Sequence, residues 1–443
     1  MRKLILTAAL LPSLAAPVAA QTAADGDRLV LSDQGGQLRV AGYEVDVDQV
    51  RFSEAGAMIL SGATLTRPGR DGHVLIRQVE IPETGLLSRL LKPASECDPT
   101  EAASGTILAR DVRFRPDSDL GVPGGREEVR VPVMEIEASR IGCSWRMSAL
   151  ADGVVISGVD GSRIDIDTVE TRMRLSGPDL KEVDARVDLI GMALTGAEGP
   201  GGLRSQEVGF SFSGDLSDSG VFGLVRSGAP LAELISVASE GVTRAGFYMR
   251  GFELVPDLFL PERDLTRLGL TGHPPISGDT EIAVSMERGA FRVRGSADMT
   301  GIVRGEMDLS GSLPRPGGVS VPDAIAGSVP VPAELIGITL ERATIRYEDL
   351  GADGIIEHMT GRPVAALATD LIGPRVERVS TRLPGGLGAT VTAAWDGVMG
   401  ILRDGNGSAG LRPEQPFSLI EFAVSGMMGP TMAASRTGAW REN

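Results

Sequence analysis

The stretch "EVDARVDLIG", residues 182–191, has the pattern that best indicates the fold class. Val183, Ala185, Val187 and Leu189 alternate with polar and charged residues, so every second side chain is apolar. Successive side chains of a β-strand point to opposite faces, and the alternation therefore predicts a strand with one buried face and one wet face. Strands of this kind are typical of antiparallel sheets.

The same alternation recurs along the whole chain. "RLVLSDQGGQLRVAG" (28–42) predicts two strands joined by a turn at residues 34–37. "EIAVSMERGAFRVRG" (281–295) predicts a hairpin that turns at Arg288 and Gly289. In "SRIDIDTVETRMRLSG" (162–177) the apolar phase changes between Ile166 and Val169, which predicts a β-bulge.

Helix signals are few and short. They predict helices at residues 86–91, 229–239, 261–268 and 416–425, and another at 351–372 that breaks near Pro363. The sequence therefore predicts a mainly β protein with a few short helices (a β-rich α+β fold). We expect curved antiparallel sheets that are elongated or arranged in two consecutive halves.

The first twenty residues have the pattern of a secretory signal peptide. Arg2 and Lys3 form a positive start, an apolar run follows, and small residues precede a cleavage site predicted after Ala20. No later apolar run approaches the roughly 18 residues that a spanning helix needs. These features predict an exported, periplasmic protein with no transmembrane segment after cleavage.

Composition narrows the classes of partner. The formal net charge is −16, and loss of the leader makes the chain still more acidic. Phosphate backbones repel such a chain, so we expect no nucleic-acid partner. The two cysteines, Cys97 and Cys143, are an even pair in a chain predicted to enter an oxidising compartment. They predict one disulfide, with two free buried thiols as the alternative.

Pro- and Gly-rich stretches predict the boundaries of the parts. Breaks lie near residues 196–204 and 312–332. After the signal peptide (1–20), we expect an N-terminal β-rich unit with the disulfide (21–200), a middle β unit with short helices (201–320) and a C-terminal strand-helix unit (321–443).

The strongest candidate for a polar site is "RATIRYEDLGADGIIEHM" (342–359). Asp349, Asp353 and Glu357 are spaced by four residues, and His358 follows. A continuous helix would place the three carboxylates on one face, as an acid/base or metal site requires. Gly351 and Gly354 argue against that helix, and residues 343–347 alternate as a strand. We therefore favour a structural interpretation, with Asp353 as a helix N-cap and Glu357 facing water.

Other motifs of enzyme chemistry are weak. "GNGSAG" (405–410) fits the glycine spacing of a dinucleotide loop, but prolines follow where the helix should begin, so the stretch predicts a turn. The three histidines, His73, His273 and His358, are far apart in sequence and in no zinc-binding frame. We expect no enzyme activity, no cofactor, no metal and no catalytic residue.

Two elements near the C-terminus resemble a known group of proteins. They are "L-x-x-A-x-I-x-Y-x-D" (340–349) and "L-x-P-x-x-P-x-S-L" (411–419). Together, over residues 338–425, they resemble uncharacterised proteobacterial envelope proteins that are distantly similar to the AsmA-like group. The resemblance implies long β-sheets whose grooves handle lipid, and it brings no catalytic residues.

These observations predict a non-enzymatic periplasmic protein that binds or handles lipid or another hydrophobic ligand on an apolar sheet groove. Many one-sided strands with few helices to cover them support this prediction, since their apolar faces must meet something. The alternatives are a structural scaffold or adaptor that binds an envelope protein, and a hydrolase with an unrecognised site.

Overall fold

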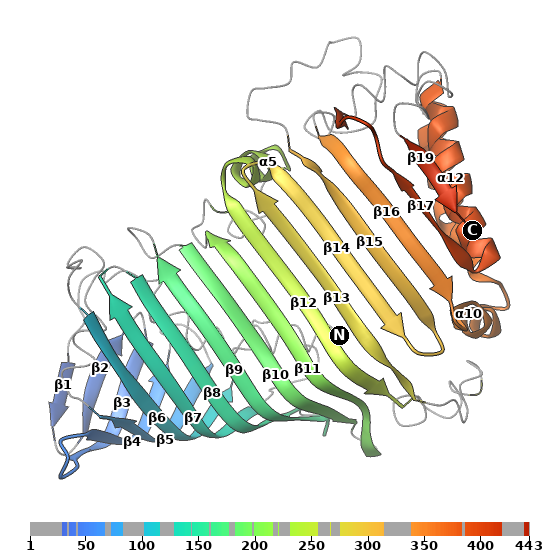
Figure 1. Ribbon diagram of the computed structural model, residues 1–443. Coiled ribbons are helices and arrows are strands. Elements are labelled where there is room, and N and C mark those ends of the chain that lie inside the picture. The colour runs from blue at the N-terminus through green and yellow to red at the C-terminus, as the bar shows by residue number, and fades with distance from the viewer. Residues whose placement is uncertain are drawn as a thin grey trace. The chain divides into compact units, whose positions relative to one another are not determined.

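The chain forms antiparallel β-structure with few helices in the computed structural model (Figure 1). Its contacts group the chain into two compact units, unit 1 (Met1–Ser213) and unit 2 (Gly214–Asn443). The structure describes residues 29–32, 35–40, 43–66, 72–82, 102–115, 128–142, 144–158, 161–176, 182–196, 199–215, 220, 231–255, 266, 275–313, 338–382, 386–418 and 438–442. The predicted mainly β fold class is confirmed.

Unit 1 is a meander in which each strand from β1 to β10 pairs antiparallel with the next. The stretch "EVDARVDLIG" lies in β10. The strands are β1 (Leu29–Ser32), β2 (Gly35–Val40), β3 (Tyr43–Phe52), β4 (Met58–Thr66), β5 (His73–Ile81), β6 (Ala102–Arg115), β7 (Glu128–Ile141), β8 (Ser144–Ser157), β9 (Arg163–Ser176), β10 (Glu182–Gly196) and β11 (Gly199–Asp215).

The sheet of unit 1 curves so that β1–β5 lie behind β6–β10 in Figure 1. Its core fills the space between these two parts. Val47 and Leu60 come from the first part, and Trp145, Met173 and Leu175 come from the second. Leu175 is only 2% exposed. The apolar face of unit 1 is therefore packed against itself, and charged residues occupy the other face.

A row of irregular positions crosses unit 1. We call it the kink row: it consists of residues at one level of successive strands, between the opposed pairs on either side, namely Asp48, Gly62, Arg77, Asp111, Pro132, Gly153, Asp167 and Gly191. On alternate strands the row residue has a positive φ, between 50° and 66°. Beyond this row the buried positions change parity, as from Ile166 to Val169, which are 3% and 2% exposed.

The β-bulge predicted in β9 is wrong, and the kink row accounts for the phase change instead. The phase change between Ile166 and Val169 is real, but β9 keeps a constant register with both β8 and β10. One extra residue in a single strand would shift the pairing. Here the neighbouring strands β8 and β10 have a positive φ at the same level, at Gly153 and Gly191. The pairing is preserved, and the apolar side chains stay on the inner face.

Unit 2 has a second antiparallel meander, in the order β12–β13–β14–β15–β16–β17–β19, with β18 also paired to β16. Its elements are α5 (Leu231–Glu240), β12 (Val242–Leu254), β13 (Ile276–Glu287), β14 (Ala290–Met299), β15 (Val303–Ser312), β16 (Thr339–Asp349), α10 (Ala352–Thr360), α11 (Val364–Arg382), α12 (Gly386–Asp404), β17 (Asn406–Leu411), β18 (Phe417–Ser418) and β19 (Ala439–Glu442).

Several local predictions are confirmed in unit 2. The hairpin β13–β14 turns at Arg288 and Gly289, whose φ values of 48° and 87° suit a two-residue turn. Helix α5 lies where residues 229–239 predict a helix. The predicted break near Pro363 separates α10 from α11.

Other local predictions are wrong or lie outside the described residues. Residues 405–410, predicted as a turn, form a turn at Gly405 and then strand β17. The helix predicted at 416–425 begins instead with strand β18, and α12 was not predicted at all. The helix at 86–91, nearly all of 261–268, residues 1–28, Cys97 and Cys143 fall outside the description, so the signal peptide and the disulfide stay predictions.

The division of the mature chain into three parts also stays a prediction. Strand β15, before the Pro- and Gly-rich stretch at 312–332, pairs along its whole length with β16, which follows that stretch.

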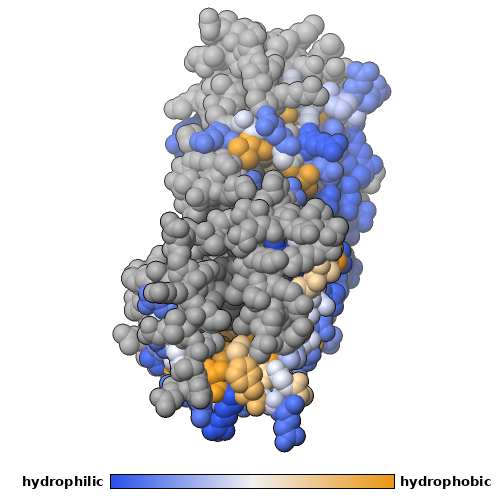
Figure 2. Space-filling model, turned by 90° about the vertical axis from the view of Figure 1, so that its left-hand side faces the viewer, coloured by the Kyte–Doolittle hydropathy of each residue, from blue (hydrophilic) through white to orange (hydrophobic). Residues whose placement is uncertain are grey.

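No helix in the described part of the chain is long and apolar enough to cross a membrane. On the side of the molecule seen in Figure 2, a few apolar patches of the described residues lie beside hydrophilic ones.

Candidate functional site

The acidic segment singled out in the sequence runs from a strand into two helices. Asp349 ends β16, as the alternation predicts, and α10 begins three residues later. The Asp349 carboxylate accepts hydrogen bonds from the backbone amides of Gly351 at 2.9 Å and Asp353 at 3.2 Å. Asp349 therefore satisfies the free amides at the start of α10.

Asp353 is not the N-cap that the sequence predicts. The N-cap of α10 is Gly351, whose φ of 145° is accessible to glycine. Asp353 instead lies in the first turn of α10, and its Oδ1 accepts the backbone amide of Val364 at 2.6 Å. Val364 is the first residue of α11, so Asp353 caps the following helix.

The remaining members of the segment do not join these carboxylates in a described cluster. Glu357 is exposed, as predicted, and the side chain of His358 lies outside the description. Burial raises the pKa of the Tyr347 phenol, and the nearby charges of Asp349 and Asp353 act in the same direction. Among the described residues, no three His, Cys, Asp or Glu side chains are grouped to hold a metal ion.

A row of apolar side chains crosses the sheet of unit 2. Ile282 of β13 is opposite Gly295 of β14, which is opposite Met307 of β15, which is opposite Ile345 of β16. Directly opposed residues of antiparallel strands share a face, so these side chains lie together. Ile282, Met307 and Ile345 are 43%, 41% and 44% exposed, and we call them the open apolar row.

Gly295 leaves room for the Met307 side chain on this face. A Cβ at Gly295 would come within 3.2 Å of Cγ of Met307, so the Met307 side chain lies across the glycine. The neighbouring row on the same face is also apolar, since Val284 is opposite Val293 and Val293 is opposite Leu309. Among the described strand residues of unit 2, Phe252 is the one buried apolar side chain. The open apolar row is therefore only partly covered by the rest of the chain.

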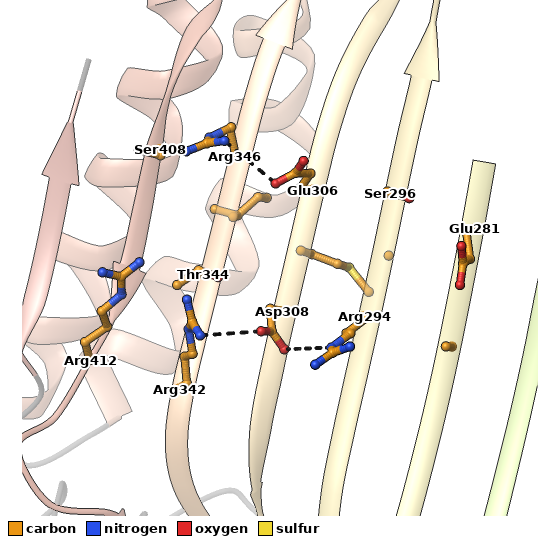
Figure 3. Close-up of a pocket in the computed structure, with 14 residues that line it drawn as sticks. Glu281, Arg294, Ser296, Glu306, Asp308, Arg342, Thr344, Arg346, Ser408 and Arg412 are labelled. Atoms are coloured by element: carbon orange, nitrogen blue, oxygen red, sulfur yellow. Dashed lines mark ion pairs between the residues drawn. The ribbon is translucent and has the colours of Figure 1, made fainter. Parts of the chain in front are cut away.

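The alternate residues of the same strands, which point to the opposite face, are charged. These residues line an open hollow of about 430 Å³, to which Gly295, Met307 and Ile345 also contribute. Figure 3 shows its arginines and carboxylates in front of the strands, with helices behind the sheet. Asp308 of β15 is central. Arg292 donates two hydrogen bonds to it, at 2.9 and 2.7 Å, and Arg342 and Arg294 lie 3.7 and 4.0 Å away.

These arginines set the charge state of Asp308. The hydrogen bond from Arg292 lowers the pKa of the Asp308 carboxyl below its ordinary value, and the charges of Arg292, Arg342 and Arg294 add to this effect. Partial burial opposes it. Arg346 lies beside Glu306 at 3.8 Å in the same hollow (Figure 3).

Sequence reasoning did not single out these charged rows. The alternation identified the wet face of each strand, as in "FRVRG" (291–295), but not the strand opposite it. The clustering of arginines depends on register, which sets Arg294 against Asp308 across β14 and β15. A register prediction for neighbouring hairpins could have found it.

The comparisons with known proteins add no relative. No protein-family model, no curated protein and no solved structure matches the chain. The AsmA-like resemblance therefore stays a prediction.

Proposed function

We propose that this chain is a non-enzymatic periplasmic protein that holds lipid or another hydrophobic molecule against the open apolar row of unit 2. One observation carries the proposal: Ile282, Met307 and Ile345 are each more than two-fifths exposed although they adjoin one another on a single face. Contiguous exposed apolar surface is uncommon on a protein without a partner or ligand, because covering it is favourable.

The chemistry of the row suits an alkyl chain better than a polar ligand. Its side chains offer no hydrogen bond, and Met307 is flexible enough to adapt to different shapes. Burying apolar surface contributes about 25 cal/mol per Å². An acyl chain laid along the row would also cover Val284, Val293 and Leu309 of the neighbouring row.

The first test is mass spectrometry of organic extracts from protein exported and purified without detergent. We expect a phospholipid or fatty acid at a fixed ratio to protein, absent from a mock purification. A second test uses a fatty acid with a diazirine group and maps its crosslinks by peptide mass spectrometry. Crosslinks are expected on β13, β15 and β16.

A matched pair of variants makes the test specific. Met307→Ser removes the centre of the open apolar row, and Leu150→Ser removes an equally exposed leucine of unit 1; both residues are 41% exposed. We expect Met307→Ser to reduce crosslinking severalfold and Leu150→Ser to leave it unchanged. Equal labelling of both variants, with clean extracts from folded protein, would count against the proposal.

A second candidate function is an adaptor for an envelope protein. The observation that favours it is on α11, where Leu371 and Ile372 are 71% and 46% exposed. Adjacent apolar side chains on a helix can anchor a partner. Crosslinking in the intact envelope, compared between the wild type and Leu371→Ser, tests this candidate, and loss of one specific adduct would favour it.

A further inference from the structure

The charged face of unit 1 brings four arginines together on adjacent strands. Arg146 of β8 is directly opposite Arg174 of β9, and Arg172 of β9 is directly opposite Arg186 of β10. Alternation along β9 places Arg172 and Arg174 on the same face, so the two opposed pairs are neighbours. All four line an open hollow of about 840 Å³.

Two of these arginines are neutralised and two are not. Arg172 forms an ion pair with Glu170 at 3.2 Å, and Arg186 forms one with Asp188 at 2.8 Å. Within the described part of the chain, Arg146 and Arg174 have no ion pair and no side-chain hydrogen bond. We call Arg146 and Arg174 the unpaired arginines.

The position of the unpaired arginines is unfavourable for the protein alone. Directly opposed residues of antiparallel strands have Cβ atoms about 5 Å apart, and like charges on such residues are destabilising. The chain has 59 acidic residues against 43 Lys and Arg, so carboxylates are in excess. Asp184 of β10 is directly opposite Arg174, yet neither unpaired arginine forms an ion pair with a described carboxylate.

The rest of the hollow is suited to an oxyanion. Its lining includes hydroxyl groups, which can donate hydrogen bonds, and two carboxylates against four arginines; these residues are Ser104, Thr106, Ser139, Ser148, Glu137 and Asp184. The hydroxyl of Ser148 donates to Glu137 at 3.1 Å, which occupies one of these carboxylates.

We propose that Arg146 and Arg174 bind one phosphoryl group between them. Guanidinium groups present paired N–H donors that match phosphate oxygens, and a doubly charged phosphoryl group would neutralise both arginines. This site lies on the polar face of unit 1 and is argued independently of the open apolar row of unit 2. The phosphoryl group can belong to a small soluble molecule or to a lipid headgroup.

The test measures thermal stability of the full chain, with its predicted leader removed, at low ionic strength. The probe is 10 mM inorganic pyrophosphate against chloride at equal ionic strength. We expect a rise in Tm of about 2 °C for a Kd of about 1 mM. Arg146→Gln with Arg174→Gln should lose this rise, while Arg163→Gln, which removes an arginine paired to Asp165, should keep it.

The double glutamine variant has a second expected property. Without ligand at low salt its Tm should equal or exceed that of the wild type, since the repulsion is gone. Arg146→Lys with Arg174→Lys keeps both charges but loses the paired donors, so it should retain less than half of the pyrophosphate effect. This variant decides the matter if the glutamine variant fails to fold.

Vesicles distinguish the source of the phosphoryl group. Sedimentation with phosphatidic acid vesicles, but not phosphatidylcholine vesicles, that requires the unpaired arginines would assign it to a lipid headgroup. A response to pyrophosphate alone would assign it to a soluble molecule. No response of the wild type to either probe, or an equal response of wild type and glutamine variant, overturns the proposal.

Discussion

Unit 1 and unit 2 are built from the same alternating strands, yet they treat their apolar faces differently. In unit 1 the sheet curves on itself and buries that face, so that Leu175 is 2% exposed. In unit 2, Ile345 lies on the apolar face of the sheet and is 44% exposed. The alternating pattern of a strand therefore predicts an apolar face but not what covers that face.

Truncating one apolar residue in each unit should separate the two units most clearly. Leu175→Ala leaves a cavity in a packed core and should lower the free energy of unfolding by about 2–5 kcal/mol. Ile345→Ala removes a side chain that is nearly half exposed, so it should cost about 1 kcal/mol or less. Denaturant unfolding followed by circular dichroism measures both. Equal losses would break the comparison.

Replacing a glycine of the kink row in unit 1 should have the second largest effect on stability. Gly191 has a φ of 66°, and a Cβ there would lie 2.0 Å from Oδ2 of Asp167. Gly191→Ala should therefore cost about 1–3 kcal/mol through backbone strain and displacement of Asp167. The matched control is Gly354→Ala in α10 of unit 2, where a Cβ meets nothing within 4 Å.

The control should change stability in the other direction. Alanine in a helix is favoured over glycine by about 1 kcal/mol, so Gly354→Ala should stabilise unit 2 slightly. Thermal unfolding by circular dichroism compares the two variants. If Gly191→Ala proved neutral, the kink row would be an accident of the sheet rather than a requirement of its curvature.

How far the sequence predicted these features depends on their range. Local patterns found the strands, the hairpin turn at Arg288 and Gly289, and the helix break at Pro363. They missed α12, in which Gly386, Gly388 and Gly397 obscure the helical pattern. They also misread the phase change in β9, because one strand cannot show that its neighbours change phase at the same level.

The candidate sites depend on pairing across strands. Asp353 caps a helix that begins eleven residues later, so no N-cap signal in the local sequence could identify its partner. The unpaired arginines and the open apolar row both require the register of several strands. The sequence predicts which face of a strand each residue occupies, but it does not predict which residues lie opposite on the neighbouring strands.

Removing the side-chain cap that Asp353 of α10 provides for α11 in unit 2 should have the third largest effect on stability. Asp353→Ala removes the acceptor of the Val364 amide and should cost about 1 kcal/mol. Glu357→Ala, at an exposed position of α10, is the control and should change stability little. Far-ultraviolet circular dichroism during unfolding reports both variants. A functional role for Asp353 would instead require a loss of ligand binding with unchanged stability.

The smallest effect is electrostatic and returns to the contrast between the units. In unit 2, Asp308 supplies a carboxylate for three arginines; in unit 1, the unpaired arginines have none. Asp308→Asn should therefore destabilise unit 2 at neutral pH, by about 0.5 kcal/mol because the pairs are partly exposed. The arginines around Asp308 would then repel one another as we infer for Arg146 and Arg174.

The pH dependence of this effect has a definite sign. The pKa of Asp308 is lower in the folded chain than its ordinary value of 3.8. Its contribution is therefore present above about pH 4 and is lost as the pH falls through the lowered folded pKa. The difference in Tm between wild type and Asp308→Asn should be largest near pH 6 and should shrink below pH 4. A difference that grew toward pH 3 would contradict the assignment.

Added pyrophosphate should partly restore the stability of Asp308→Asn if an external oxyanion can replace a missing carboxylate, as we propose for unit 1.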